Sequence, residues 1–339
     1  MASIDQVARE AGVSITTVSH VFSGKRPVAP ETRRRVLDAA ERLRYRPHRA
    51  ARGLATGRTM TIGLHFPFGG ESFAQDPFFL ELLEGLSSAA AEAGYGFLLI
   101  PASLDARFPL KLALQERRFD GVIIANPVTD SPLVPMLLRR RVPLVTTGRY
   151  LGPAKVPWVD NDHRGVVAQL VAHLEEQGYE RPALISHSGR FSYNQDVQES
   201  FAREVRARGG EVSIARAEDF SEERGFLHAL RLLCRPDPPD AIVGSVDRQA
   251  LGVLRAAREL RLRVPRDLGV AGVDDSMPAR QSQPPLTSIR VRPLVLGEVA
   301  LQSLLAMVER STVPENRLLP SELIPRASTR RNRRRSSRP

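Results

Sequence analysis

A run of small polar side chains near the start of the chain has the residue types of a surface that reads nucleic acid. The segment is Ser14-Ile-Thr-Thr-Val-Ser-His-Val-Phe22. Ser14 is placed to cap a short helix, in which Val18 and Val21 share one inward face. Hydroxyl, imidazole and small apolar groups meet base edges and phosphates in the major groove of DNA. The outward side chains of this type are Ile15, Thr16, Thr17, Ser19 and His20.

The flanking residues predict two further helices that would hold this segment in place. Ser3 and Gln6 form a capping-box pattern, and Gly12 ends that first helix by taking a left-handed conformation. Two short helices joined by a tight turn and supported by a third make a helix-turn-helix unit. A three-helix bundle without a DNA function has the same pattern, so the pattern alone leaves both interpretations open. The third helix is predicted from helical spacing of Val36, Leu37, Ala40 and Leu43.

The distribution of charge favours the DNA-binding interpretation. Residues 1–58 hold 12 Lys+Arg against 5 Asp+Glu, whereas residues 59–325 hold 30 basic and 33 acidic residues. A basic head on a slightly acidic body favours nucleic acid at the head over a membrane-coating surface. Residues 326–339 contain 7 arginines and no acidic residue. With no apolar side chain from Ser328 onward, this basic tail is predicted to be disordered.

Several classes of protein are disfavoured by the chain as a whole. Its 339 residues contain no apolar run of membrane-spanning length and begin without a secretion-signal pattern. Cys234 is the single cysteine, and no Cys/His set has zinc spacing. We therefore expect a cytoplasmic, nucleoid-associated protein with no metal and no cofactor.

From Met60 onward, short apolar strands alternate with amphipathic helices. This rhythm predicts parallel sheets covered by helices on both faces, arranged as two doubly wound lobes with a ligand cleft at the carboxyl ends of the strands. Strands are predicted over residues 61–66, 96–100, 121–125, 143–146, 183–186, 212–215, 241–244, 269–273 and 322–324. Helices are predicted over residues 77–93, 110–118, 133–140, 164–177, 195–208, 222–233, 248–260 and 294–310.

An ordered series of motifs resembles the lac repressor (LacI/GalR) family over nearly the whole chain. At the head these are Ile4-Asp-Gln-Val-Ala-Arg-Glu-Ala-Gly-Val-Ser14, Thr17-Val-Ser19, Pro30-Glu-Thr-Arg-Arg-Arg-Val-Leu37 and Tyr45-Arg-Pro47. In the core they include Asp76-Pro-Phe-Phe79, Val159-Asp-Asn161 and Gly272-Val-Asp-Asp275. The resemblance implies an all-α helix-turn-helix head joined by a hinge helix to a two-lobed α/β core similar to periplasmic sugar-binding proteins.

The same resemblance implies the division of the chain. The head is expected at 1–46, a hinge helix and linker at 47–58, and the effector-binding and dimerisation core at 59–325. Within the core, lobe one is expected at about 60–158 plus 288–325 and lobe two at about 159–287. Three crossings between the lobes suit a hinge that closes on a ligand.

The resemblance also implies a set of DNA-binding residues. Ile15 and Thr16 match base-reading positions, and His20 stands where the family usually has Arg. Leu54 matches a leucine that the hinge helix pushes into the minor groove, where an apolar wedge kinks the duplex. Gly53 departs from the better helix formers usual at that position. The full set is Ser14, Ile15, Thr16, Thr17, Ser19, His20, Arg33, Tyr45, Arg52 and Leu54.

The implied effector site takes its residues from both lobes. Phe78 and Phe220 match positions where rings cover a sugar or purine, although core packing is an alternative for the neighbouring Phe79. Arg149 matches a strand end at the mouth of the cleft, where a solvated loop residue is the alternative. Asp275 matches a carboxylate that accepts ligand hydroxyls. Val197 and Val246 replace hydrogen-bonding residues of many family members. The full effector set is Phe78, Arg149, Tyr193, Phe220, Asp247 and Asp275.

These observations predict a transcriptional repressor that binds a pseudo-palindromic operator as a homodimer and is controlled by a small molecule, such as a sugar. The alternatives are a regulator without an effector, a non-specific DNA-organising protein and a secreted solute-binding protein. An enzyme is not expected, because the chain has no Gly-x-Ser-x-Gly motif, phosphate-binding loop or metal motif. Asp274 and Asp275 alone make a weak case for an acid/base pair.

Overall fold

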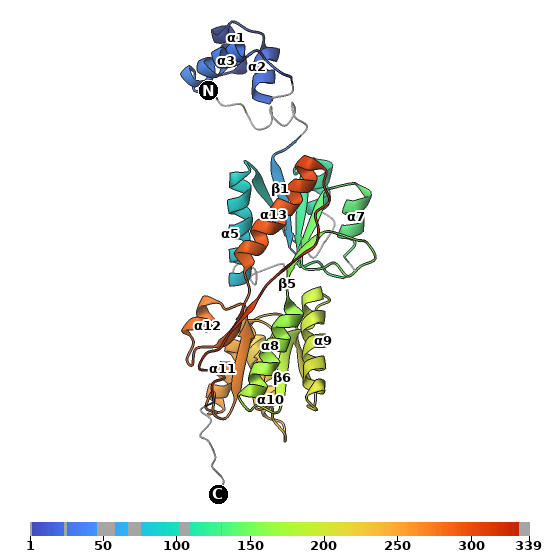
Figure 1. The fold of residues 1–339 in the computed structure, drawn as a ribbon, viewed down its shortest axis with the longest axis vertical. Helices are drawn as coiled ribbons and strands as arrows, with labels where there is room; N and C mark the ends of the chain where they lie inside the picture. Colours follow the sequence, from blue (N-terminus) through green and yellow to red (C-terminus); the bar gives the residue numbers. More distant parts are fainter. Residues whose placement is uncertain are drawn as a thin grey trace.

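The N-terminal head is the predicted helix-turn-helix unit. The computed structural model describes residues 2–23, 26–45, 58–66, 76–101, 109–129 and 131–331. The head consists of α1 (Ile4–Ala11), α2 (Ile15–Ser23) and α3 (Pro30–Arg42), drawn in blue in Figure 1. The capping box is confirmed, because the Gln6 backbone N–H donates to Ser3 Oγ at 3.3 Å and the Ser3 N–H donates to Gln6 Oε1 at 2.8 Å. Gly12 ends α1 with a φ of 62°, as predicted.

The inward faces of the three helices form a small apolar core. Val7 on α1, Val18 on α2 and Val36 on α3 are all fully buried. The expectation for Leu37 is wrong, because its side chain is 41% exposed. Leu37 lies about 100° around the helix from Val36, beyond the arc that the buried side chains of α3 occupy, and so outside the inward face. The inward stripe of α3 consists of Val36, Ala39, Ala40 and the partly buried Leu43.

The first lobe is a parallel sheet with helices packed on it. Its strand order is β11-β5-β4-β3-β1-β2, and all neighbouring pairs are parallel. The strands are β1 (Thr61–Phe66), β2 (Gly96–Pro101), β3 (Gly121–Ala125), β4 (Leu144–Thr147), β5 (Trp158–Asn161) and β11 (Arg317–Leu319). The helices are α5 (Pro77–Glu92), α6 (Pro109–Gln115), α7 (Leu133–Arg139) and α13 (Pro293–Arg310).

The second lobe is also a six-stranded sheet with helices packed on it, and it has one antiparallel edge strand. Its order is β12-β10-β9-β8-β6-β7, in which only the β10–β12 pair is antiparallel. The strands are β6 (Pro182–His187), β7 (Ser213–Ala217), β8 (Ala241–Gly244), β9 (Gly269–Val273), β10 (Thr287–Arg290) and β12 (Glu322–Ile324). The helices are α8 (His163–Glu176), α9 (Ser192–Ala207), α10 (Glu222–Leu233), α11 (Asp247–Glu259) and α12 (Met277–Gln281).

The chain crosses between the two sheets three times, after β5, after β10 and between β11 and β12 (Figure 1). The expected lobe ranges need correction at these crossings. β5 belongs to the first sheet, whereas β10 and β12 belong to the second, in which Ser288 is paired with Ile324. Strands of three or four residues carry too little pattern to reveal which sheet they join.

The first residues of the basic tail are ordered, which corrects the prediction for 326–331. Ser328 and Thr329 are fully buried. The Ser328 hydroxyl donates to the Val270 carbonyl at 2.6 Å and accepts the Thr287 N–H at 2.7 Å. This segment is fixed by polar bonds to buried groups, which a count of apolar residues does not detect. Residues 332–339 lie outside the described part of the chain.

Close packing of α5 against α13 shapes the first lobe. A Cβ atom added to Gly85 would lie 1.9 Å from the Leu294 carbonyl oxygen, so only glycine permits this approach. In Figure 1 the two helices run side by side on one face of the lobe.

No helix in the described ranges is both long and apolar enough to cross a membrane.

Candidate functional site

The outer face of α2 presents the side chains that were predicted to read DNA. Ser14 and Thr16 are exposed, and Ile15 is 47% exposed, which is unusual for an isoleucine and leaves it free to meet another molecule. Ser19 and His20 are half-buried beside them.

Three of the predicted residues, Ser14, Thr17 and Tyr45, have structural roles within the head. The Thr17 hydroxyl is 2.8 Å from that of Ser14, whose oxygen also accepts the Thr17 backbone N–H at 3.1 Å and so caps α2. The ring of Tyr45 packs on the head core, with its centroid 5.8 Å from that of Phe22. Arg33 is exposed on α3. The predictions for Arg52 and Leu54 fall outside the described residues.

Sequence reasoning missed Arg35, which stabilises the turn between α1 and α2. Its guanidinium donates to the carbonyl oxygens of Ala11 and Gly12, the latter at 3.3 Å. These carbonyls belong to the end of α1, where the helix leaves them without partners. One arginine among the several in α3 gives no sequence signal for this role.

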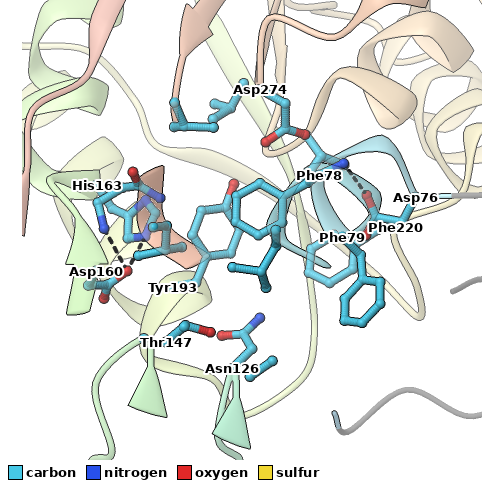
Figure 2. A pocket seen from close by; sticks show the side chains of 18 residues that line it. Asp76, Phe78, Phe79, Asn126, Thr147, Asp160, His163, Tyr193, Phe220 and Asp274 are labelled. Carbon is cyan, nitrogen blue, oxygen red and sulfur yellow. Dashed lines mark hydrogen bonds and ion pairs between the residues drawn. The ribbon is translucent and has the colours of Figure 1, made fainter. Parts of the chain in front are cut away.

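A cavity of about 90 Å³ lies between the two lobes, at the carboxyl ends of their strands (Figure 2). This is the predicted place for a ligand in doubly wound sheets. Its walls come from both lobes, and Figure 2 shows the polar and aromatic side chains directed toward one another across it. The lining residues are Asp76, Phe78, Phe79, Leu82, Ala125, Asn126, Thr147, Gly148, Asp160, Asn161, His163, Tyr193, Phe220, Val246, Val273, Asp274, Val291 and Leu296.

Three of the six predicted effector residues line this cavity, and all three are aromatic. They are Phe78 from the start of α5, Tyr193 from α9 and Phe220 from the loop before α10. The Tyr193 hydroxyl donates to the Ser245 carbonyl oxygen, which fixes its ring. Phe220 stacks on His187 with ring centroids 4.5 Å apart. Fixed rings of this kind offer flat apolar faces to a ring-shaped ligand.

Asp275 does not line the cavity, contrary to the expectation for it. Its side chain is fully buried and accepts hydrogen bonds from Arg290 at 2.7 Å and from Arg326, with Arg280 at 3.1 Å. Burial opposes the charge, but the hydrogen bonds from Arg290 and Arg326 outweigh it and lower the pKa of Asp275. The carboxylate therefore joins β10, α12 and the C-terminal segment.

Asp274, one residue earlier, is the carboxylate that faces the cavity. Both residues have left-handed backbones, with φ of 118° for Asp274 and 54° for Asp275. Such conformations are rare outside glycine and cluster at functional sites. Burial raises the pKa of Asp274 well above its usual range, and the negative charges of Asp247 and Asp76 raise it further. Two adjacent aspartates in sequence do not reveal which of them faces a ligand.

Asp247 also lies outside the cavity lining, in a fully hydrogen-bonded position beneath it. Its carboxylate accepts from the Ser276 N–H at 2.7 Å, the Ser276 hydroxyl at 2.9 Å and the Ser288 hydroxyl at 2.6 Å. Burial raises the pKa of Asp247 to about 6. Asp247 therefore holds α11, α12 and β10 together. Contrary to the expectation for it, its side chain does not line the cavity.

Arg149 joins the lobes instead of lining the cavity. Its guanidinium pairs with Asp196 of α9, and its backbone N–H donates to the Ser192 hydroxyl at 3.1 Å. Arg164 reaches the other oxygen of Asp196 at 2.9 Å. Arg149 follows β4 of the first lobe, so this cluster bridges the two halves of the core.

A polar group at the end of β5 was missed as part of the site. Asp160 Oδ1 accepts the Asn161 N–H and the His163 Nε2–H, both at 2.9 Å (Figure 2). The opposite ring nitrogen, His163 Nδ1, and the amide oxygen Asn161 Oδ1 are buried and have no hydrogen-bond partner among the residues that the structure describes. Buried polar atoms are almost always hydrogen-bonded, so these two atoms indicate groups that a ligand supplies. The motif Val159-Asp-Asn161 was the available signal.

No group of His, Cys, Asp and Glu side chains suited to a metal ion occurs in the part of the chain that the structure describes.

Comparison with known sequences supports both parts of the chain. Residues 3–48 match the pattern of "Bacterial regulatory proteins, lacI family", and residues 171–329 match a "Periplasmic binding protein-like domain". The regulator AglR of Rhizobium meliloti is 32% identical over 335 residues, covering 96% of this chain and 94% of its own. The repressor PurR of Escherichia coli is 31% identical and covers 97% of both chains.

Comparison with solved structures gives the same picture. A complex of the regulator CelR with cellobiose superposes with a TM-score of 0.75 at 31% identity, over 97% of this chain and 100% of the other. A lac repressor dimer bound to operator and the anti-inducer ONPF superposes with a TM-score of 0.83 at 25% identity, over 97% of this chain and 99% of the other.

Proposed function

The chain belongs to the lacI family of bacterial regulatory proteins, and we propose that it is a repressor that binds operator DNA as a homodimer and responds to a small molecule held between its lobes. The observation that supports this most strongly is the cavity, whose walls from both lobes contain buried polar atoms without partners. A module that only organises DNA has no need of such a cavity. We assign no reaction to it.

The proposed DNA contact places α2 in the major groove. Ile15 and Thr16, at the start of the helix, would meet base edges, and His20 would read one further position. An exposed Ile15 supports this placement, as does the net charge of residues 1–58. Arg52 and Leu54 would add contacts from the hinge segment. Two heads of a dimer would read the two halves of a pseudo-palindrome, because operator symmetry mirrors protein symmetry. This action takes place on the nucleoid, in the cytoplasm.

One helix connects the cavity to the residue at which the linker enters the core. Leu296, near the start of α13, lines the cavity. Near the other end, the Val308 carbonyl oxygen accepts from the Arg58 guanidinium at 3.1 Å. The 18 residues of α13 span about 27 Å at 1.5 Å per residue. We propose that a ligand moves α13 and with it the start of the linker.

The end of the linker is held on a second side by Asp120. Its carboxylate accepts the backbone N–H groups of Thr59 at 2.6 Å and Met60 at 2.8 Å. The linker therefore enters lobe one from a fixed point, so a change of angle between the lobes changes the spacing of the two heads in a dimer. DNA affinity then shifts only as far as the ligand prefers one lobe arrangement over the other.

A selection from random DNA with the purified full-length chain tests the proposed function. We expect a single enriched motif with two-fold symmetry, and the same motif with a reduced preference in an Ile15→Ala variant. The matched control is Leu112→Ala, since Leu112 is also exposed (47%) but lies on α6 of the core. Enrichment of no motif, or of one without symmetry, would contradict the proposal.

A further inference from the structure

Apart from His163, the acidic and basic side chains in the cavity lining are all aspartates. In the described part of the chain, Asp76, Asp160 and Asp274 line it, and no lysine or arginine does. A ligand entering this cavity therefore meets carboxylates from both lobes, since Asp76 precedes α5 and Asp274 follows β9. The sign of this charge restricts the class of ligand.

Two of the three carboxylates have compensating neighbours. Asp160 pairs with His163 Nε2 at 2.9 Å. Asp76 caps α5 by accepting the Phe78 N–H at 3.1 Å, and the positive charge of Arg248 acts on it. Each of these two charges is therefore partly balanced by groups of the protein.

Asp274 has the opposite surroundings. Among the described residues, the side chains acting most strongly on it are the carboxylates of Asp247, Asp76 and Glu81, and the opposing contact is the backbone N–H of Asp247. Burial and these like charges disfavour the ionised form of Asp274, whereas a positive group placed beside it favours that form. The geometry thus leaves a place for a positive group of the ligand beside Asp274.

The opposite wall of the cavity offers acceptors for hydroxyl groups. Asn161 is 2% exposed and His163 is 8% exposed, and within the described ranges Asn161 Oδ1 and His163 Nδ1 have no hydrogen-bond partner. In the tautomer whose Nε2–H donates to Asp160, Nδ1 is left as an acceptor. Both atoms require hydrogen-bond donors, which sugar hydroxyls supply.

From these two walls and the aromatic faces between them, we propose that the effector is a polyhydroxylated ring compound that carries a protonated amine, of the amino-sugar class. Its ammonium group pairs with Asp274, its hydroxyls donate to Asn161 and His163, and its apolar face lies on Phe78 or Phe220. This inference rests on the proposed function, because it names the ligand of the same cavity. An acidic or phosphorylated sugar would place a further negative charge among these aspartates, so we expect it not to bind.

Calorimetry on the full-length chain with matched sugars tests this inference. The probes are glucosamine, galactosamine and mannosamine, each with its neutral parent hexose and its N-acetyl derivative, together with glucose 6-phosphate. We expect at least one hexosamine to bind about tenfold or more tightly than its parent and its N-acetyl form, and glucose 6-phosphate not to bind. Equal or tighter binding of the neutral forms, or no binding of any hexosamine, would overturn the inference.

A pair of variants identifies the carboxylate responsible. Asp274→Asn is expected to remove the preference for the amine while keeping the fold, which a thermal unfolding midpoint checks. Asp267→Asn is the matched control, because Asp267 is an exposed aspartate of the same lobe paired with Arg263. A preference that persists in Asp274→Asn would overturn the assignment. Operator binding measured on the same samples separates the two proposals, since a protein that binds a symmetric site without preferring amines retains the proposed function.

Discussion

Asp274 faces the cavity between the lobes, whereas Asp275, its neighbour in sequence, is enclosed by three arginine side chains. The two left-handed backbone conformations turn the carboxylates in different directions. One aspartate is therefore free to meet a ligand, and the other holds the second lobe together. This division of roles leads to opposite expectations for substitution at the two positions.

Asp275→Ala should destabilise the second lobe. Removing one partner of a buried ion pair costs about 3–5 kcal/mol, and we expect about 2–3 kcal/mol here because Arg280 and Arg290 are 46% and 41% exposed. Asp274→Ala should cost less than about 1 kcal/mol, because it removes a charge surrounded by like charges. Urea unfolding curves of the two variants decide between them. Equal loss at both positions would mean that Asp274 is also structural.

The stability of the chain should depend on pH through the buried aspartates. The pKa of Asp247 is about 6 in the folded chain and that of Asp274 is also raised, against about 3.9 in an unfolded chain. Between these values the folded state binds more protons than the unfolded state. The free energy of unfolding contributed by this pair is therefore largest at low pH and falls as pH rises from about 4 to above 6.

The measurement for this prediction is a difference between two proteins. Unfolding free energies of the wild type and of Asp274→Asn are compared from about pH 4.5 to about pH 7.5. The variant should gain stability relative to the wild type as pH rises, because it lacks the charge that is costly at high pH. Carboxylates with lowered pKa, such as Asp267, act the other way but equally in both proteins. A difference that is constant with pH would refute the shared titration of Asp247 and Asp274.

Removing the C-terminal segment 326–339 should destabilise the second lobe. The truncation removes the hydrogen bonds of Ser328 and Thr329 and one arginine partner of Asp275. At about 1 kcal/mol for each hydrogen bond, we expect a loss of about 3 kcal/mol or more. Removal of 332–339 alone is the control, against which the loss due to 326–331 is measured. If both truncations behave alike, the contacts of 326–331 contribute nothing to stability.

His20→Arg should change the base preferred at one symmetric position in each half of the operator. Arginine makes a bidentate contact to guanine that histidine cannot make, and the contact discriminates by about 1–3 kcal/mol. Selection of binding sites with both proteins measures the change. The same motif from both would show that His20 meets no base.

Much of the fold could be predicted from the sequence, because local signals mark long elements. The capping box at Ser3, the turn at Gly12 and the alternation of apolar strands with amphipathic helices gave the head and both lobes. The crossings were harder, since β10 and β12 acquire their places through pairing with other strands of the second sheet, β10 with β9 and β12 with β10. Tertiary contacts determine such short strands.

The site was predicted in part for the same reason. Phe78, Tyr193 and Phe220 line the cavity, because the ends of parallel strands and the starts of the following helices meet there. The polar residues were harder to assign, because their neighbours come from distant segments. The Asp275 carboxylate accepts a hydrogen bond from Arg326, which is 51 residues away in sequence. No local pattern reports such a contact.

Nuclease footprinting on the enriched DNA site determines whether this chain acts at a single symmetric operator. We predict one bounded region of protection, symmetric about its centre, that stays the same length as the protein concentration rises. Ile15→Ala should need more protein to give the same footprint, whereas Leu112→Ala should match the wild type. Protection that spreads along the DNA with increasing protein, to the same extent on any sequence, would contradict the account and show a DNA-organising protein instead.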